Sequence, residues 1–363
     1  MEPNTSLNRL AATLHDIPYS RPSSPGVQSA PHQIGFLGLG AMGYFMARNL
    51  ANHRNSHPQG APPLLVYNRT REKAERLLKE LGPNKIRIAD NPEQLARECN
   101  VIITNLGNDT VVKSVYARFK EALNDDPHTS TKIFVETSTC YPTVAGELDS
   151  MISGFPHTHL ITCPVFGRPS VADKAGLVLV MSGDYRSKKE VAYLLVPAIG
   201  RKVIDLGGNL EKAPTLKLIG NSIILGCMEV MSESLTLGEK TGVGAPAVLS
   251  LLRDLIPAPI VTGYADKMTH DLFDGKEGFA IEGGMKDATH MKNLASEYNA
   301  VMPTIDVAYR HMITARAIHE AQRASGSTDY EVLDWSALVA GPRVASGLDG
   351  FNSEKHIRVE KEE

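Results

Sequence analysis

The stretch IGFLGLGAMG at residues 34–43 decides the fold, because it joins a short apolar run to a glycine pattern and then to a helical pattern. The apolar run predicts a strand and residues 44–50 predict a helix, so GxGxxG lies between the two. A lone GxGxxG is often only a tight turn. In this setting, however, the first glycine permits the turn, the second lets the backbone approach a pyrophosphate, and the third allows close helix–strand packing. The stretch therefore predicts a dinucleotide site formed by Gly38, Leu39, Gly40, Ala41, Met42 and Gly43.

The next predicted strand, residues 64–67, ends in Asn68, Arg69 and Thr70. An NAD site places an acidic residue at such a strand end, where it binds the ribose hydroxyls. A carboxylate repels a 2′-phosphate, whereas Arg69 can pair with its charge and Thr70 can donate a hydrogen bond. We therefore expect these three residues to bind NADP(H) in preference to NAD(H), with NAD(H) still possible. The alternative is that Arg69 only begins the charged helix at 71–79.

Strand patterns continue to alternate with helical ones, at residues 100–104, 133–136, 159–162 and 177–181. This alternation predicts an α/β fold with a parallel, doubly wound sheet. Ligands of such sheets bind beyond the carboxyl ends of the strands, where polar segments follow these runs. At one of these ends we expect Leu106 and Gly107 to contact the cofactor.

The pattern changes period after the glycine turn at 207–208. Residues 214–240 contain no further proline after Pro214 and carry one helical stripe, with Lys217 and Asn221 one turn apart at its start. The stripe continues through Ile224, Met228, Met231 and Leu235. A lysine beside an apolar stripe is costly unless it has a partner or a function, but it can also extend from the helix start to solvent. The spacing alone leaves both interpretations open.

A chain of 363 residues exceeds the usual size of one domain. We expect a flexible extension at 1–32, an NAD(P)-binding domain at 33–207, an all-helical domain at 208–345 and a charged, solvated tail at 346–363. The extension has no apolar core typical of a secretory signal, and its acidic residues make it a poor transit peptide. We therefore expect a cytoplasmic protein, with the mitochondrial matrix as the alternative.

The composition argues against several classes of partner. A formal net charge of −3 gives no reason to expect nucleic acid or an anionic membrane. No run of roughly 18 apolar residues suggests a membrane span. The four cysteines form no CxxC pair and the histidines form no recognisable ligand motif, so neither a metal nor a disulfide framework is expected.

Taken in order, five motifs resemble the β-hydroxyacid dehydrogenase family, which includes 3-hydroxyisobutyrate dehydrogenase and the tartronate semialdehyde and glyoxylate reductases. The resemblance covers about residues 34–340 and includes an NAD(P)-binding domain like that of 6-phosphogluconate dehydrogenase. The motifs are the glycine signature at 35–43, Thr137-Ser138-Thr139 with Pro142, Gly208 followed by Lys217-Leu218-Ile219-Gly220-Asn221, Lys286-Asp287, and Asp334-Trp335-Ser336-Ala337.

The resemblance implies a Rossmann domain joined by a long interdomain helix to an all-α domain that builds a homodimer or homotetramer. Together with the cofactor preference expected from Asn68, Arg69 and Thr70, it implies an NADP(H)-dependent dehydrogenase or reductase that moves hydride between nicotinamide and the carbonyl or alcohol carbon of a β-hydroxyacid or semialdehyde. Lys217 is then the general acid and base, because a lysine is protonated at neutral pH and can stabilise a developing alkoxide. Ser138, Thr139 and Asn221 are implied to bind substrate, and Thr139 and Lys286 to reach the cofactor.

One turn departs from the family pattern. Phe166-Gly167-Arg168-Pro169 stands where the family has a small serine–glycine–glycine turn that meets the substrate carboxylate. We expect Gly167 and Arg168 to contact a substrate bulkier than glyoxylate, with a second anionic group as one option. The alternative is that Arg168 pairs with an acid such as Asp173 and Phe166 packs inward. Imine reductases also vary at this turn but generally lack the lysine, so Lys217 argues against that activity and against a non-catalytic cofactor-binding scaffold.

Overall fold

The structure is a computed structural model that describes residues 16–20, 32–55, 60–276, 278–328 and 330–356. The chain divides into two compact units, residues 1–217 and 218–363, and each is described by itself. The boundary lies inside helix α9 (Lys212–Lys240), ten residues after the expected end of the first domain at residue 207. The first turns of α9 belong to the first unit because they contact it, as Lys217 does through the ring of Phe166.

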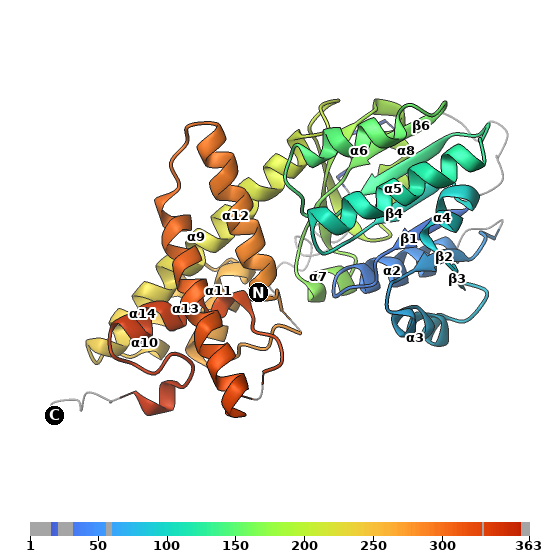
Figure 1. Ribbon diagram of the computed structural model, residues 1–363. Coiled ribbons are helices and arrows are strands. Elements are labelled where there is room, and N and C mark those ends of the chain that lie inside the picture. Colours follow the sequence, from blue (N-terminus) through green and yellow to red (C-terminus); the bar gives the residue numbers. More distant parts are fainter. Residues whose placement is uncertain (1–15, 21–31, 56–59, 277, 329, 357–363) are drawn as a thin grey trace, which may run out of the picture. The chain divides into compact units, whose positions relative to one another are not determined.

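The first unit is built on a mainly parallel sheet, seen on the right of Figure 1. Strands β3, β2, β1, β4, β5 and β6 lie side by side in that order and are all parallel. Their bounds are β1 (Ile34–Leu37), β2 (Leu64–Tyr67), β3 (Ile86–Ile88), β4 (Val101–Thr104), β5 (Lys132–Glu136) and β6 (Thr158–Thr162). The chain leaves β1 for β2 on one side and later returns to β4 on the other. The turn after β1 is therefore at the switch point where open α/β sheets bind ligands.

Helices cover both faces of this sheet, as the doubly wound prediction requires (Figure 1). They are α2 (Gly43–Asn55), α3 (Arg71–Leu81), α4 (Pro92–Glu98), α5 (Asp109–Asp125) and α6 (Val144–Ile152). Alternate residues of a strand enter different cores: Phe36 packs in the cluster that includes α2 and α3, and Leu37 packs in the cluster that includes α4, α5 and α6. Burial on both faces explains why these strands read as unbroken apolar runs.

Beyond β6 the sheet changes direction. β7 (Val165–Phe166) and β6 both pair antiparallel with β8 (Leu177–Gly183), which pairs parallel with β9 (Gly200–Asp205). The helices here are α7 (Pro169–Asp173) and α8 (Tyr185–Leu195). Strands β3 and β7 were not predicted, because three and two residues are too few to show a period.

Residues 16–20 correct one expectation, since they are not part of a flexible extension. Asp16 pairs with the edge of β9: its amide donates to Arg201 at 3.2 Å and its carbonyl accepts from Val203 at 2.9 Å. Tyr19 is buried, and its carbonyl oxygen accepts a hydrogen bond from the Tyr193 hydroxyl at 2.6 Å. A five-residue segment with a proline in its middle shows no periodic signal, so the sequence did not reveal it. Residues 1–15 and 21–31 of the predicted extension lie outside the described residues.

The second unit is helical, as expected. Its elements are the rest of α9, α10 (Ala245–Leu255), α11 (Pro259–Thr269), α12 (Ile281–Glu297), α13 (Pro303–Ser325), the 3₁₀ turn η1 (Trp335–Val339), α14 (Ala340–Ala345) and the 3₁₀ turn η2 (Ser353–Lys355). The predicted stripe of α9 faces the core of this unit: Met228, Met231 and Leu235 are buried there and Ile224 packs against it. In the described part of the chain, α9 is the one helix long and apolar enough to cross a membrane, a test that buried core helices also pass.

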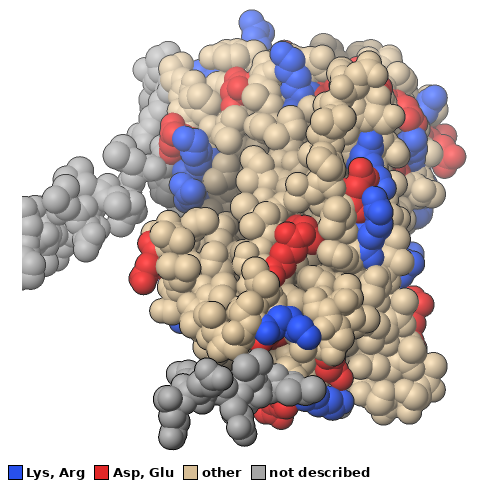
Figure 2. All heavy atoms as spheres, turned by 90° about the vertical axis from the view of Figure 1, so that its left-hand side faces the viewer, with Lys and Arg blue, Asp and Glu red and all other residues tan. Residues whose placement is uncertain are grey.

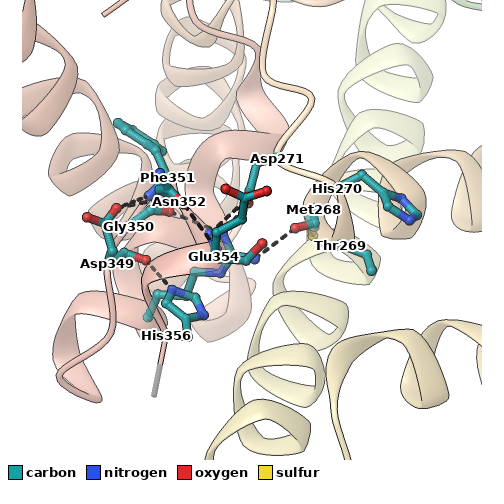
Figure 3. A network of polar contacts seen from close by, with 12 residues as sticks. Met268, Thr269, His270, Asp271, Asp349, Gly350, Phe351, Asn352, Glu354 and His356 are labelled. Carbon is teal, nitrogen blue, oxygen red and sulfur yellow. Dashed lines mark hydrogen bonds and ion pairs between the residues drawn. The ribbon is translucent and has the colours of Figure 1, made fainter. Parts of the chain in front are cut away.

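The C-terminal segment gives a second correction. Residues 349–356 were expected in a solvated tail but pack against the helical unit (Figure 3). Phe351 packs against Phe273 with tilted rings whose centroids are 5.6 Å apart, and the amide of Ser353 donates to Asp271 at 2.8 Å. The fully buried Arg343 pairs with the same Asp271 at 2.7 Å. The segment is held by one aromatic ring and by polar contacts, which hydropathy does not reveal. Residues 357–363 lie outside the described residues.

Candidate active site

The glycine-rich turn has the geometry of a dinucleotide cradle. Gly38 has φ +102°, and a Cβ there would lie 2.1 Å from the carbonyl oxygen of Asn105. A Cβ on Gly43 would lie 1.9 Å from the carbonyl oxygen of Gly38, whereas one on Gly40 would meet nothing within 4 Å. The outer glycines are therefore required by packing, and the middle one leaves open space beside the start of α2. This arrangement fits a pyrophosphate at a helix N-terminus.

Asn68 shapes this turn. Its side-chain oxygen accepts a hydrogen bond from the amide of Leu39 at 2.8 Å, and its side-chain nitrogen donates to the carbonyl of Thr70 at 2.8 Å. Arg69 and Thr70 are exposed beyond it, at the carboxyl end of β2. Thr70 precedes α3 but makes no side-chain capping bond. Asn68 therefore holds the glycine turn against the strand end, where Arg69 and Thr70 face solvent.

The turns that follow β4 and β5 form another edge of the candidate site, which we call the rim. The amide of Leu106 donates to the Ser138 hydroxyl oxygen at 2.7 Å, and the side chain of Asn105 donates to the Thr137 hydroxyl oxygen at 3.0 Å. A Cβ on Gly107 would meet nothing within 4 Å, so this turn is also open. The structure thus brings the predicted cofactor residue Leu106 together with the predicted substrate residue Ser138.

Glu136 supports this rim and was missed by the sequence reasoning. It is buried at the end of β5, where one carboxylate oxygen accepts the Ser138 amide at 2.7 Å and the other accepts the Thr104 hydroxyl at 2.6 Å. Burial raises the pKa of Glu136 and also raises the pKa of the neighbouring Tyr116 well above its ordinary value. The available signal was an acidic residue ending an apolar run two positions before Ser138. Glu136 fixes the backbone that presents Ser138.

Lys217 is buried on α9, with 9% of the residue exposed. Its Nζ lies over the ring of Phe166, 4.3 Å from the ring centroid. The start of the helix is tied to the carboxyl end of β6, because the Thr162 hydroxyl donates to the carbonyl of Leu210 at 2.7 Å. Lys217 is therefore held near the strand ends where ligands of such sheets bind, and it does not extend into solvent.

In the second unit, Asn221 binds an aspartate that sequence reasoning did not single out as a site residue. The side-chain nitrogen of Asn221 donates to Asp287 at 2.8 Å, and Lys286 pairs with the other oxygen of Asp287 at 3.0 Å. Asp287 is fully buried on α12. Its neighbour in the Lys286-Asp287 motif was the available signal. The contact fixes the orientation of the Asn221 side chain.

The turn at 166–169 is tightly constrained. Gly167 has φ +146°, and a Cβ there would lie 2.5 Å from a methyl carbon of Leu177. Arg168 is half-buried and precedes α7. Asp173, the expected alternative partner of Arg168, pairs with Arg48 of α2 at 2.5 Å. Phe166 does not simply pack inward, because the face of its ring meets Lys217.

Within the described residues, no group of three or more His, Cys, Asp or Glu side chains could hold a metal ion. The first unit has open backbone turns at Gly40 and Gly107, with Asn68 and Ser138 bonded to the neighbouring backbone. These are features that fit an organic dinucleotide and a small polar substrate.

Comparison with known proteins agrees with this geometry. Residues 33–208 match the family described as the NAD binding domain of 6-phosphogluconate dehydrogenase. The chain is 27% identical over 308 residues to the NADH-dependent oxidoreductase ucdB of Aspergillus ustus, covering 85% of this chain and 98% of the relative. It is 26% identical over 309 residues to glyoxylate/succinic semialdehyde reductase 1 of Arabidopsis thaliana, covering 85% and 97%.

A solved structure shares the fold. The 3-hydroxyisobutyrate dehydrogenase of Mycobacterium tuberculosis, crystallised with L-serine, superposes with a TM-score of 0.67 at 20% identity, covering 85% of this chain and 98% of that one. The first unit is thus an NAD(P)-binding domain of the 6-phosphogluconate dehydrogenase type. The chain is an oxidoreductase similar to the hydroxyacid and semialdehyde reductases.

Proposed function

We propose that this protein is an NADP(H)-dependent reductase that transfers hydride between nicotinamide and the carbonyl or alcohol carbon of a β-hydroxyacid or semialdehyde. Lys217 is the general acid of the reduction and the general base of the reverse reaction. The observation that carries the proposal is the buried ammonium of Lys217, held over Phe166 near the strand ends of an NAD(P)-binding domain. Burying a charge is costly, and the cost is expected where the charge has a chemical role.

We assign each of these residues a separate role according to its position. The open turn at Gly40 and the start of α2 would hold the pyrophosphate, and Arg69 with Thr70 would bind the 2′-phosphate. When bound, NADPH supplies the hydride. Lys217 donates its proton to the carbonyl oxygen as the oxygen gains negative charge. Ser138 and Thr139 hydrogen-bond the substrate carboxylate.

Asn221 is another polar residue that we propose binds substrate. Asp287 fixes the Asn221 amide, which would therefore meet substrate in a set orientation. Lys286, bound to the same aspartate, would reach the nicotinamide end of the cofactor.

A spectrophotometric assay of NADPH oxidation tests the proposal, with glyoxylate, succinic semialdehyde, larger ketones and cyclic imines as substrates. Lys217→Ala should reduce kcat by roughly a hundredfold or more, the scale of lost general acid catalysis, with cofactor affinity and Tm little changed. Lys212→Ala is the matched control, because Lys212 is an exposed lysine on the same helix.

Near-normal turnover of Lys217→Ala would show that the lysine is not the acid. Turnover of cyclic imines alone would assign the protein to imine reduction. Failure of every substrate class, with NADPH bound, would favour a cofactor-binding scaffold.

A further inference from the structure

The contact between Phe166 and Lys217 has no counterpart in a small serine–glycine–glycine turn. The Lys217 Nζ lies 4.3 Å from the centroid of the Phe166 ring. At this distance the negative face of an aromatic ring attracts an ammonium, and the attraction grows when water is excluded. Lys217 is 9% exposed, so the contact forms in a largely desolvated place.

The backbone of Phe166 is held firmly enough to set the position of its ring. In β7, Val165 and Phe166 pair with Leu179 and Val178 of β8. The amide of Val180 donates to the carbonyl of Pro164 at 3.0 Å, which extends this pairing by one residue. On the other side of Phe166, Gly167 adopts a conformation that only glycine readily takes, against the side chain of Leu177. The ring therefore emerges from a rigid hairpin.

We propose that Phe166 is a positioning residue for Lys217: its ring holds the ammonium in place and favours its charged form until the proton is transferred. The inference rests on the proposed role of Lys217 as the acid. A cation–π contact stabilises the ammonium but not the neutral amine, so it is strongest in the state that must donate. A flat ring also covers the ammonium with an apolar surface, in a turn whose family counterpart offers backbone amides.

Two substitutions of Phe166 distinguish the effect of its aromatic face from the effect of its size. Phe166→Leu keeps an apolar side chain but removes the aromatic face, whereas Phe166→Tyr keeps the face. Tyr309→Leu is the matched control, because it removes a cation–π contact of similar length, 4.6 Å to Lys292, within the second unit. Leu at 166 should lower kcat by about three- to tenfold, which is within the range of a partly desolvated cation–π contact, with KM changed less. Tyr at 166 should restore most of the loss.

The reactivity of the Lys217 amine tests the proposal by a measurement that does not depend on turnover. Only a neutral amine reacts with acetic anhydride, so labelling of Lys217 in the protein without cofactor, followed by mass spectrometry over a pH series, gives the midpoint of deprotonation. Because the ring favours the charged form, Phe166→Leu should move this midpoint to lower pH by about half a unit to one unit. The alkaline limb of the kcat/KM profile should move in the same direction. Greater access of reagent alone would change the maximal labelling rate but not the midpoint.

The experiments can contradict the proposed function and the inference about Phe166 independently of each other. Normal turnover of Lys217→Ala removes the proposed function, whatever the labelling shows. An unchanged midpoint in Phe166→Leu, or the same shift in Phe166→Tyr, overturns the inference about the ring even when Lys217 proves essential. A shift with Leu, its recovery with Tyr and no shift with Tyr309→Leu support it.

Discussion

At the scale of single residues, cofactor choice depends on Arg69. The side chain is exposed at the carboxyl end of β2, and the neighbouring Asn68 is occupied with the glycine turn. Arg69→Asp replaces attraction for a 2′-phosphate by repulsion, so it should weaken NADPH binding by about tenfold or more and leave NADH binding little changed. Isothermal titration of both cofactors measures the difference.

Arg71→Ala is the control for this prediction, since Arg71 lies two residues away but pairs with Glu75 along α3 at 3.1 Å. It should leave the ratio of the two affinities unchanged. Equal affinities for NADPH and NADH in the unmutated protein would contradict the preference itself. The NADH-dependent relative from Aspergillus ustus makes this comparison necessary.

Single residues also show where sequence reasoning stops. The types and spacing of Gly38 and Gly43 were informative because local chain geometry demands them, whereas the spacing of Lys217 left its role open. Glu136 and Asp287 were not identified as site residues, because their importance comes from partners 32 and 66 positions away in the chain. The contact of Phe166 with Lys217 joins a hairpin to a helix and leaves no trace in either local pattern.

At the scale of elements, the strands of the sheet that are buried on both faces were predictable and the short edge elements were not. The same limit explains residues 16–20 and 349–356, which have too few apolar residues to show a period. On α9 the period was correct and placed Met228, Met231 and Leu235 on one face. That face forms the core of its own unit.

The C-terminal segment leads to a prediction about stability. Arg343 is buried, pairs with Asp271 at 2.7 Å and with Glu239 at 3.4 Å, and donates to the carbonyl of Met268 at 2.9 Å. Arg343→Met would leave the largely buried Asp271 without its cation, while Glu239 would keep only its contact with His356 at 2.8 Å. Breaking a buried pair in this way costs about 3–5 kcal/mol, so the variant should unfold at much lower urea concentration.

Lys355→Met is the comparison within the same segment, because Lys355 forms an exposed ion pair with Asp349 at 3.5 Å. Exposed pairs contribute about 0–1 kcal/mol, so this variant should unfold close to the unmutated protein. Far-UV circular dichroism during urea titration compares the two. Equal stability of both variants would mean that Arg343 does not hold the segment.

At the scale of the whole molecule, no sign of charge dominates. The face in Figure 2 carries basic and acidic side chains interspersed with broad uncharged areas, in keeping with the small net charge of −3. The exposed apolar residues are more informative. Ile223, Val230 and Leu237 recur every seven residues along α9, on a different face from the buried stripe, and each is more than half exposed. Leu251 and Leu255 of α10 are exposed to a similar degree.

These residues lead us to propose that the second unit assembles with another copy of the chain. A cavity of about 530 Å³ lies beside the exposed face of α9, lined in part by Ile223, Val230, Ile256 and Val301. An apolar face with a hollow is typical of a surface that receives side chains from a partner, whereas a monomer seldom leaves so many large apolar residues exposed together. Because the resemblance implies a homodimer or homotetramer, we expect the partner to be an identical subunit.

Light scattering at micromolar concentration tests this assembly. The unmutated protein should have a mass of at least twice 39.4 kDa. Val230→Lys places a charge in the middle of the face and should shift the protein toward monomer, because an unpaired charge in an apolar interface is costly. Val344→Lys, at an exposed apolar residue of α14, should leave the mass unchanged. A stable monomer of the unmutated protein would leave the exposed face of α9 without a second copy to cover it, and that outcome would refute the assembly.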